Sequence, residues 1–295
     1  LLGVSLALTL ATLVPGVAAG DRWLRLGPLN LQPTELLKFS LIVYLAASLT
    51  RRADRVGTFS QGVWPHLVVA GGAGLVSIAQ PDFGMALMFL SVTYFVLFVA
   101  GARWKHLLGT LLAALQPLAL LMVAAPYRRA RLLSFLDPFA DAERGGYQII
   151  QSLVSLGSGG LWGRGLGGGV EKLGYLPAAH TDFIFSVVGE ELGVVGTVAI
   201  VAAFFGVGAL GLRVAPRAPD AFSRLLASGV ALALRFQALL NLGLALGALP
   251  VTGLTLPFVS YGGSSLLVSL AMAGVLVSVA RAGGGHDQRA GLRGR

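Results

Sequence analysis

Charged residues are scarce in this chain, and cysteine is absent. Only 12% of its 295 residues are charged, whereas 55% are hydrophobic and the mean hydropathy is +0.79. A water-soluble globule of this length cannot hide that much apolar surface, so the composition excludes a soluble protein and indicates an integral membrane protein. The absence of cysteine excludes disulfides and thiolate chemistry.

Acidic residues are fewer than basic ones, which gives a formal net charge of +9. The basic residues cluster in short segments between apolar runs, as is typical of cytoplasmic loops and of attraction to anionic membrane lipid. We therefore expect no nucleic-acid partner. The basic segments are Arg51–Arg55, Arg103–Lys105, Arg213–Arg224 and 281–295.

Long apolar runs predict an all-α, polytopic helical membrane protein that forms a single domain over residues 1–295. A helix needs about 20 apolar residues to cross the hydrocarbon core, whereas barrel strands would alternate polar and apolar residues. No basic segment precedes the first run, so we expect no cleavable signal peptide and a true start upstream of Leu1. The eight predicted spans are Leu1–Ala19, Glu35–Leu49, Val63–Ile78, Gly84–Gly101, Leu107–Ala125, Phe183–Leu212, Leu225–Leu249 and Leu266–Ala280.

The positions of lysine and arginine predict the orientation of these spans. The four basic segments fall on one side under the eight-span count, and that side is the cytoplasm. Residues 126–182 then form a long extracytoplasmic loop, and residues 281–295 form a basic cytoplasmic tail. The arginines within 128–131 depart from this pattern, which long loops follow weakly. The other outer segments are 20–34, 80–83 and 250–265.

The long outer loop contains two motifs, each with a functional and a simpler interpretation. YRRARLLSFLDPF predicts an interfacial helix, which either anchors the loop or offers Arg128 and Arg131 to a phosphorylated lipid headgroup. GSGGLWGRGLGGG, residues 157–169, has the spacing of a dinucleotide fingerprint, but no strand precedes it, so we exclude that fold. Its glycines either cradle an anion beside Arg164 and Lys172 or form a hinge.

Asp182 stands where this loop enters the apolar run that begins at Phe183. A carboxylate there is partly desolvated by aromatic neighbours, yet a hydrophilic substrate can still reach it from the water side. This position suits the general base of a membrane enzyme. The simpler interpretation is that Thr181 or Asp182 caps the following helix, and position alone favours neither.

Charged residues also occur where apolar spans have no need of them. Glu35 and Lys38 stand three apart at a helix start, where they either form a local salt bridge or belong to a site. Asp82 lies in an outer turn, where a turn-forming aspartate is common. Glu190 and Glu191 are costly at membrane depth and therefore predict a polar cavity or a basic partner.

The last two spans are interrupted by LPVTGLTLPFVSYGGSS, whose prolines, glycines and hydroxyls are typical of broken helices that line a cavity. In the preceding span, Gln237 and Asn241 are one turn apart. They either hydrogen-bond between helices or line that cavity. Arg235 in the same span requires a nearby acid.

Taken in order, these motifs resemble a known family. From about Arg22 to Ser265 the chain carries RWLRLG with QPTELLK, QPDFG, FLDPFAD with GYQIIQS, GSGG with GRGLG, KLGYLP with HTDFIF and GEELG, QALLN, and LPVTGLTLPFVSYGGSS. This series closely resembles the SEDS (shape, elongation, division and sporulation) family of RodA- and FtsW-like proteins. The resemblance implies a fold of typically ten spans, two of them before Leu1. The chain departs from the family pattern at Ala178, where glutamate is usual, and at Gly169 and Glu171.

The resemblance implies a peptidoglycan glycosyltransferase of the bacterial cytoplasmic membrane. Such a protein polymerises lipid II into a growing glycan strand at the outer face and works with a class B penicillin-binding protein. Asp182 matches the family's essential acid, which we expect to act as general base. We expect no dedicated metal site, although a divalent cation held by acids could supply positive charge. The expected substrate contacts are Glu35, Lys38, Asp82, Arg22, Trp23, Arg128 and Arg164.

Two other function classes stay open. A lipid II flippase would need a polar path through the bilayer, which Glu190, Glu191 and Arg235 could line, although no inverted repeat is visible. A noncatalytic scaffold for a cell-wall synthase would explain the basic tail but not the outward polar cluster.

Overall fold

The computed structural model describes every residue except 20–21, 27–28, 125 and 294–295, and it describes no side chain at 19, 26, 29, 118, 121–128, 131 and 285–293. The chain forms two compact units. Unit 1 comprises Leu1–Leu108, Gly206–Phe236 and Gly263–Arg295, and unit 2 comprises Gly109–Phe205 and Gln237–Gly262.

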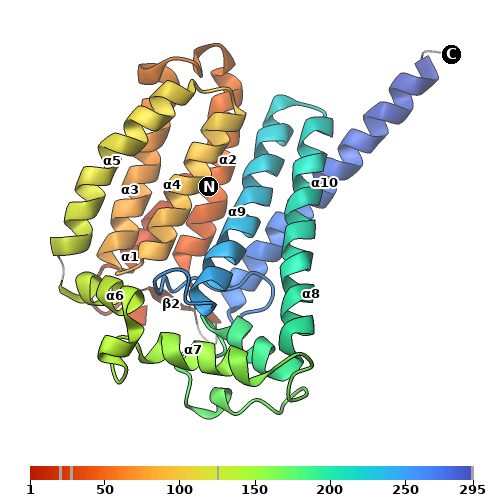
Figure 1. The fold of residues 1–295 in the computed structure, drawn as a ribbon. Coiled ribbons are helices and arrows are strands. Elements are labelled where there is room, and N and C mark those ends of the chain that lie inside the picture. Colours follow the sequence, from red (N-terminus) through yellow and green to blue (C-terminus); the bar gives the residue numbers. More distant parts are fainter. Residues whose placement is uncertain (20–21, 27–28, 125, 294–295) are drawn as a thin grey trace. The chain divides into compact units, whose positions relative to one another are not determined.

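Long helices occupy the predicted apolar runs, the first run only in part (Figure 1). Such runs become helices because every backbone N–H and C=O must be paired where no water reaches it. The helices are α1 (Leu2–Ala11), α2 (Pro33–Arg51), α3 (Trp64–Ala79), α4 (Phe83–Val99), α5 (Trp104–Ala124), α8 (Ile184–Val214), α9 (Ala221–Ala245) and α10 (Gly263–Arg293).

In the part of the chain that the structure describes, four helical segments are long and apolar enough to cross a membrane. They are Phe59–Ala79, Ile184–Arg217, Ala221–Ala245 and Gly263–Gly284. The protein is therefore a helical membrane protein, as the composition indicates. The number of eight spans stays a prediction.

The first predicted span, Leu1–Ala19, is wrong in its length because α1 ends at Ala11. The apolar character of the sequence continues beyond this point, but Pro15 lacks a backbone N–H and Gly16 has a φ of 85°. Both residues oppose continuation of a helix.

A small antiparallel sheet replaces helix and loop in the first outer segment, which departs from the all-α prediction. Its order is β1-β2-β3, and Leu24 pairs with Leu31 across the second pair of strands. The alternation in this stretch explains the strand, because Leu24 is buried while the adjacent Arg25 is exposed. The strands are β1 (Ala18–Ala19), β2 (Trp23–Leu26) and β3 (Leu29–Leu31).

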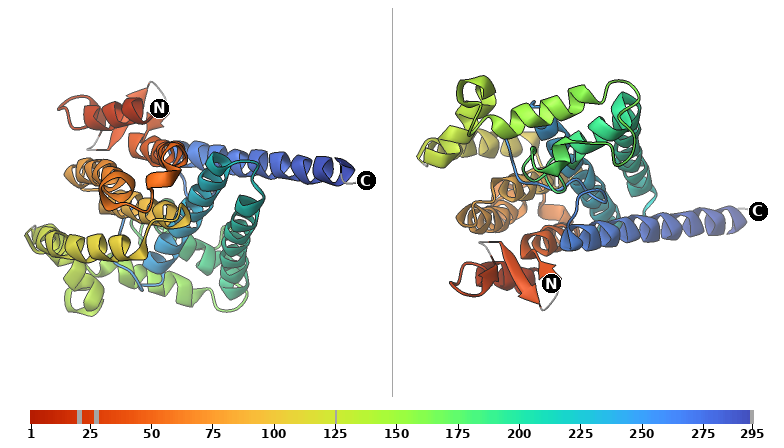
Figure 2. Two further views of the ribbon diagram at one scale, coloured as in Figure 1. Left: turned by 90° about the horizontal axis from the view of Figure 1, so that it is seen from above. Right: turned by 90° about the horizontal axis from the view of Figure 1, so that it is seen from below.

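Helix α2 forms the core of unit 1, where it contacts α1, α3, α4 and α10. Leu37, Leu41 and Leu45 recur every four residues along one face of α2 and are completely buried. Gly229 of α9 permits a close approach to this helix, because an added Cβ would lie 2.7 Å from Ile42 Cγ2. Figure 2 shows α2, α3 and α4 nearly end-on as one group of helices.

Unit 2 contains the whole of the long loop, residues 126–182, which carries two helices. The predicted interfacial helix corresponds to α6 (Pro126–Leu136), and its place at a membrane interface stays a prediction. Helix α7 (Tyr147–Ser158) was not predicted and lies crosswise to α8 (Figure 1). The two helices join through buried hydroxyls, since Ser152 Oγ lies 2.6 Å from Ser186 Oγ and Ser155 Oγ donates to Ser186 O at 3.0 Å.

Candidate functional site

Asp182 lies on the turn that leads into α8, as the sequence predicts. Its side chain is half-buried, whereas the next residue, Phe183, is completely buried in an apolar cluster with Leu176 and Val187. The aromatic ring therefore anchors the end of the turn in the core of unit 2. Asp182 stands at the boundary between that core and a more accessible surface.

Three consecutive backbone carbonyls of this turn accept hydrogen bonds from residues distant in the sequence. The donors and acceptors are Tyr261 N and His180 O (2.9 Å), Ser260 Oγ and Thr181 O (2.6 Å), and Asn241 Nδ2 and Asp182 O (2.8 Å). Two of the donors belong to the segment between α9 and α10, and the third belongs to α9. Hydrogen bonds from α9 and from the segment that follows it therefore restrain the backbone at Asp182.

The turn also closes on itself through Ala178. Both the Thr181 hydroxyl and the Phe183 N–H donate to the Ala178 carbonyl, each at 3.2 Å. Ala178 adopts a φ of 55°, a left-handed conformation that costs an alanine about 1 kcal/mol and that glycine adopts readily. The tertiary contacts of the turn therefore hold its backbone in a conformation that the local sequence does not favour.

Glu35 and Lys38 form the predicted salt bridge in the first turns of α2. Lys38 Nζ donates to Glu35 Oε2 at 2.6 Å, and each side chain is only 2% exposed. The helix starts at Pro33, whose fixed φ suits the first helical position. A buried ion pair of this kind costs much desolvation, so it is weak evidence for stability alone.

Asp82 and Arg22 lie together in unit 1. Asp82 caps α4 by accepting a hydrogen bond from Met85 N at 3.1 Å. Its other carboxylate oxygen, Oδ2, is 4.0 Å from Arg22 Nη1. The Arg22 Nε group also donates to Gln80 O at 2.9 Å. Arg22, the residue before β2, therefore joins the small sheet to the turn before α4.

The predicted substrate contacts divide between the two units. Arg164 and Asp182 belong to unit 2, and the Arg128 side chain lies outside the described residues. Within unit 1 the structure brings Glu35 to Lys38 and Arg22 to Asp82. Trp23, at the start of β2, is half-buried. The unit 1 residues are Arg22, Trp23, Glu35, Lys38 and Asp82.

The glycine-rich loop of residues 157–169 packs into a break in α8. Gly193 has φ 66° and ψ −164°, so the helical hydrogen-bond ladder is interrupted there. The N–H and C=O groups that the break leaves without a partner inside α8 form hydrogen bonds with the backbone of the loop. The bonds are Arg164 N to Glu190 O (2.9 Å), Gly165 N to Glu191 O (3.0 Å), Val194 N to Gly160 O (3.0 Å) and Val195 N to Leu161 O (3.3 Å).

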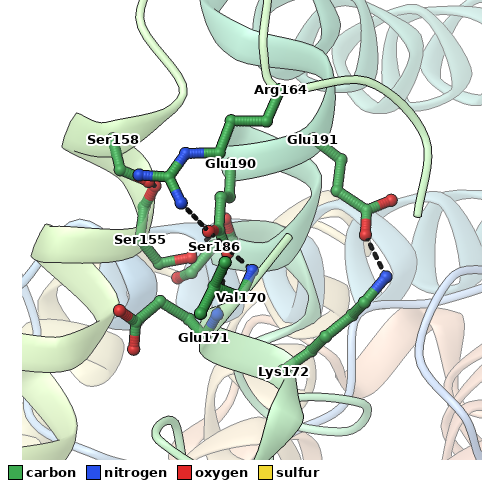
Figure 3. Close-up of polar contacts among 9 residues, drawn as sticks. All are labelled: Ser155, Ser158, Arg164, Val170, Glu171, Lys172, Ser186, Glu190 and Glu191. Atoms are coloured by element: carbon green, nitrogen blue, oxygen red, sulfur yellow. Dashed lines mark hydrogen bonds and ion pairs between the residues drawn. The ribbon is translucent and has the colours of Figure 1, made fainter. Parts of the chain in front are cut away.

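Two carboxylates of α8 hold the same loop (Figure 3). Glu190 is completely buried and Glu191 is partly buried. The Glu190 contacts are Arg164 Nη1 (3.1 Å), Val170 N (2.9 Å) and Glu171 N (3.2 Å), and the Glu191 contacts are Lys172 Nζ (2.5 Å) and Gly167 N (3.0 Å). Of the two alternatives that the sequence left open for these acids, a polar cavity or a basic partner, the structure shows basic partners. The anions held by the loop amides are the chain's own carboxylates.

Glu171 is the one acid of this cluster outside α8. Burial raises the pKa of its carboxyl above the usual 4.5, the charge of Glu190 raises it further, and Arg164 partly opposes both effects. Figure 3 shows its carboxylate directed away from the Glu191–Lys172 pair. Glu171 thus contributes its backbone N–H to the cluster, while its own charge is disfavoured there.

Sequence reasoning did not recognise that Asn241 and Ser260 hold the Asp182 turn. Asn241 was expected to bond between helices or line a cavity, and Ser260 appeared only as part of a longer motif. The available signal was a buried amide one helical turn after Gln237, facing a segment rich in hydroxyls. Which carbonyls these donors reach depends on chain folding over 59 and 79 residues of separation.

Comparison with known sequences gives one family and several close relatives. The family of cell cycle proteins FtsW/RodA/SpoVE matches residues 1–283. A probable peptidoglycan glycosyltransferase FtsW of Geobacter sp. (strain M18) is 45% identical over 276 residues, which are 92% of this chain and 75% of that protein. Stage V sporulation protein E of Bacillus subtilis (strain 168) is 40% identical and covers 93% of this chain and 76% of its own length.

Comparison with solved structures gives the same family. A chain in the structure described as "Structural coordination of polymerization and crosslinking by a peptidoglycan synthase complex" is 37% identical, with a TM-score of 0.78 over 95% of this chain and 79% of that one. Rod shape determining protein RodA of Thermus thermophilus is 35% identical, with a TM-score of 0.64 over 95% of this chain and 76% of its own.

Proposed function

This chain belongs to the FtsW/RodA/SpoVE family and is a peptidoglycan glycosyltransferase, and from that premise we propose that it polymerises lipid II with Asp182 as general base. The observation that carries the proposal is the position of Asp182, half-buried on a turn that packing and hydrogen bonds hold in place. A general base must be held where it can reach the proton it removes, yet remain open to substrate.

In the proposed reaction, a hydroxyl of the acceptor lipid II attacks the anomeric carbon of the growing strand. The bond from that carbon to the lipid pyrophosphate breaks, and Asp182 takes the proton of the attacking hydroxyl. A pyrophosphate leaves without being protonated, so the reaction requires positive charge more than a second carboxylic acid. This differs from the paired carboxylates of glycosidases.

The positive charge is proposed to come from the cations predicted as substrate contacts, Lys38, Arg22, Arg128 and Arg164. Lys38, Arg22 and Arg164 each have an acidic neighbour within 4.0 Å, so a phosphate would have to compete with that carboxylate or share the cation with it. Among the described residues, no three of His, Asp or Glu gather closely enough to hold a metal ion. A divalent cation held by one or two carboxylates would complete its ligand shell with water or substrate phosphates.

The proposed setting is the outer face of the bacterial cytoplasmic membrane, with a class B penicillin-binding protein as partner. Support comes from the structural relative at TM-score 0.78, which is described as a peptidoglycan synthase complex that coordinates polymerisation and crosslinking. A glycosyltransferase without crosslinking chemistry of its own needs such a partner to join its strands.

The flippase alternative is less well supported, because the acids that suggested it have other roles. Glu190 and Glu191 form ion pairs with Arg164 and Lys172 close to the break in α8. In unit 1 the Arg235 stem packs close to Gly208 of α8, where an added Cβ would lie 2.7 Å from Arg235 Cδ. Each of these contacts gives its residue a packing or pairing role within its own unit.

Replacement of the acid tests the proposal. Asp182→Ala should lower glycan polymerisation from lipid II in detergent by at least about 100-fold, since general bases contribute roughly that much or more. The matched control is Asp220→Asn, at the exposed turn before α9, which should polymerise normally. Full activity of the Asp182 variant would refute the assignment. Transport seen only across sealed vesicles, without polymer, would favour the flippase.

A further inference from the structure

We propose that Asn241 is a positioning residue for the reaction, which acts by fixing the backbone of Asp182. This inference rests on the proposed function of Asp182 as the base. Asn241 is 0% exposed, and its amide nitrogen donates to two carbonyls, those of Asp182 and Leu254, each at 2.8 Å. One side chain thus ties α9, the acid and the segment before α10 together.

The chemistry of the amide fixes its orientation. Only the nitrogen of an asparagine side chain can donate, and it has two N–H groups. Both are used here on carbonyl acceptors, so the amide cannot rotate without losing two hydrogen bonds. Its oxygen, Oδ1, is buried and has no donor among the described residues, which is the cost of this arrangement. Packing alone would favour leucine at such a site, because leucine carries no group to satisfy.

The position of the bond determines what it can do for catalysis. The acceptor is the main-chain oxygen of Asp182 itself, so the bond restrains the peptide plane from which the catalytic side chain extends. Ser260 restrains the preceding plane through Thr181 O at 2.6 Å, and the same hydroxyl accepts from Leu256 N at 2.7 Å. Displacement of a catalytic group by about 1 Å can cost about 100-fold in rate.

Gln237 provides a matched comparison one turn earlier on α9. It is also 0% exposed, and its amide donates to Thr255 O at 2.9 Å, next to the carbonyl that Asn241 holds. Its bond therefore anchors the same segment at Thr255, whereas the Asn241 amide also reaches the carbonyl of Asp182. A residue that merely stabilises the segment should behave like Gln237, whereas a positioning residue should not.

The test compares Asn241→Ala, Asn241→Asp and Gln237→Leu in lipid II polymerisation, with thermal unfolding as a folding check. We expect Asn241→Ala to lower kcat about 100-fold with KM within about twofold of the parent protein. Asn241→Asp keeps the volume, and burial keeps its carboxyl neutral with one O–H donor, so its loss should be smaller. Gln237→Leu should retain kcat within about threefold.

Three outcomes would overturn the inference. They are wild-type kcat in Asn241→Ala, a loss that appears only in KM, and an equal loss of kcat in Gln237→Leu. If Asn241→Ala fails to fold, the Asn241→Asp result decides, since one lost donor should still lower kcat. Asp182→Ala in the same assay separates the two proposals: if it is active, the base assignment fails, and if it is inactive beside an active Asn241→Ala, only the positioning inference fails.

Discussion

Glu190 is completely buried, and its carboxylate accepts hydrogen bonds from Arg164 and from the backbone N–H groups of Val170 and Glu171. Glu190→Ala would leave two amide N–H groups and the Arg164 guanidinium without their acceptor. Because Arg164 is 44% exposed and water can take over part of its hydration, we expect a loss of about 2–3 kcal/mol rather than the larger value of a fully buried pair. Thermal unfolding in detergent measures this, and Glu143→Ala, at an exposed acid, should leave the transition unchanged.

Replacement of Glu171 should raise the stability of the protein, whereas replacement of Glu190 should lower it. Its folded-state pKa is raised, so the protonated form is favoured in the folded protein, and stability is lost as pH rises from about the unfolded value of 4.5 through the raised pKa. Glu171→Gln removes the charge and keeps the backbone N–H that Glu190 accepts. We expect this variant to be more stable than the parent at neutral pH and equally stable near pH 4. Unfolding curves of both proteins across this range measure the difference in stability, and the prediction is contradicted if the advantage of Glu171→Gln does not grow as pH rises.

At the scale of elements, the break in α8 depends on Gly193. A Cβ at this position would lie 2.4 Å from Gly163 N, and the backbone has a φ of 66° that other residues adopt at a cost. Gly193→Ala should therefore destabilise the protein by about 2–4 kcal/mol through strain and clash together.

Gly206 of the same helix is the control for Gly193. A Cβ there meets nothing within 4 Å, so Gly206→Ala should be neutral or stabilising through better helix propensity. Limited proteolysis of the loop at residues 157–169 reports whether it has left the helix. Equal resistance of both variants would mean that the loop does not depend on the break.

The elements also show where sequence patterns succeed. The later spans were predicted because a long apolar run has few alternatives to a helix in lipid. The first was overestimated because hydropathy does not register the effect of Pro15 and Gly16 on the backbone. Helix α7 was overlooked although Ile149, Leu153 and Leu156 have helical spacing, because a 12-residue amphipathic helix falls short of any span criterion.

At the scale of the whole molecule, the absence of cysteine makes the predicted topology directly measurable. Single cysteines at the exposed positions Leu173 and Arg217 would lie on the outer and the cytoplasmic side under the positive-inside rule. A membrane-impermeant maleimide added to intact cells should label Leu173→Cys and spare Arg217→Cys until the cells are lysed. Labelling of both variants in intact cells, or the reverse pattern, would contradict the eight-span orientation.

The sequence by itself determined that this is a helical membrane protein and which apolar runs lie in helices. It also determined that Asp182 lies immediately before one of these helices. Composition and local pattern suffice for such properties, because they arise from the hydrophobic effect and from backbone pairing within a segment. Only the tertiary structure decided which groups hold the Asp182 turn and which carboxylates are paired with basic side chains. Asn241 meets Asp182 O, and Glu190 meets Arg164, across 59 and 26 residues of chain. Hydrogen bonds and ion pairs of this range depend on distances that folding sets, and residue type or spacing does not encode them.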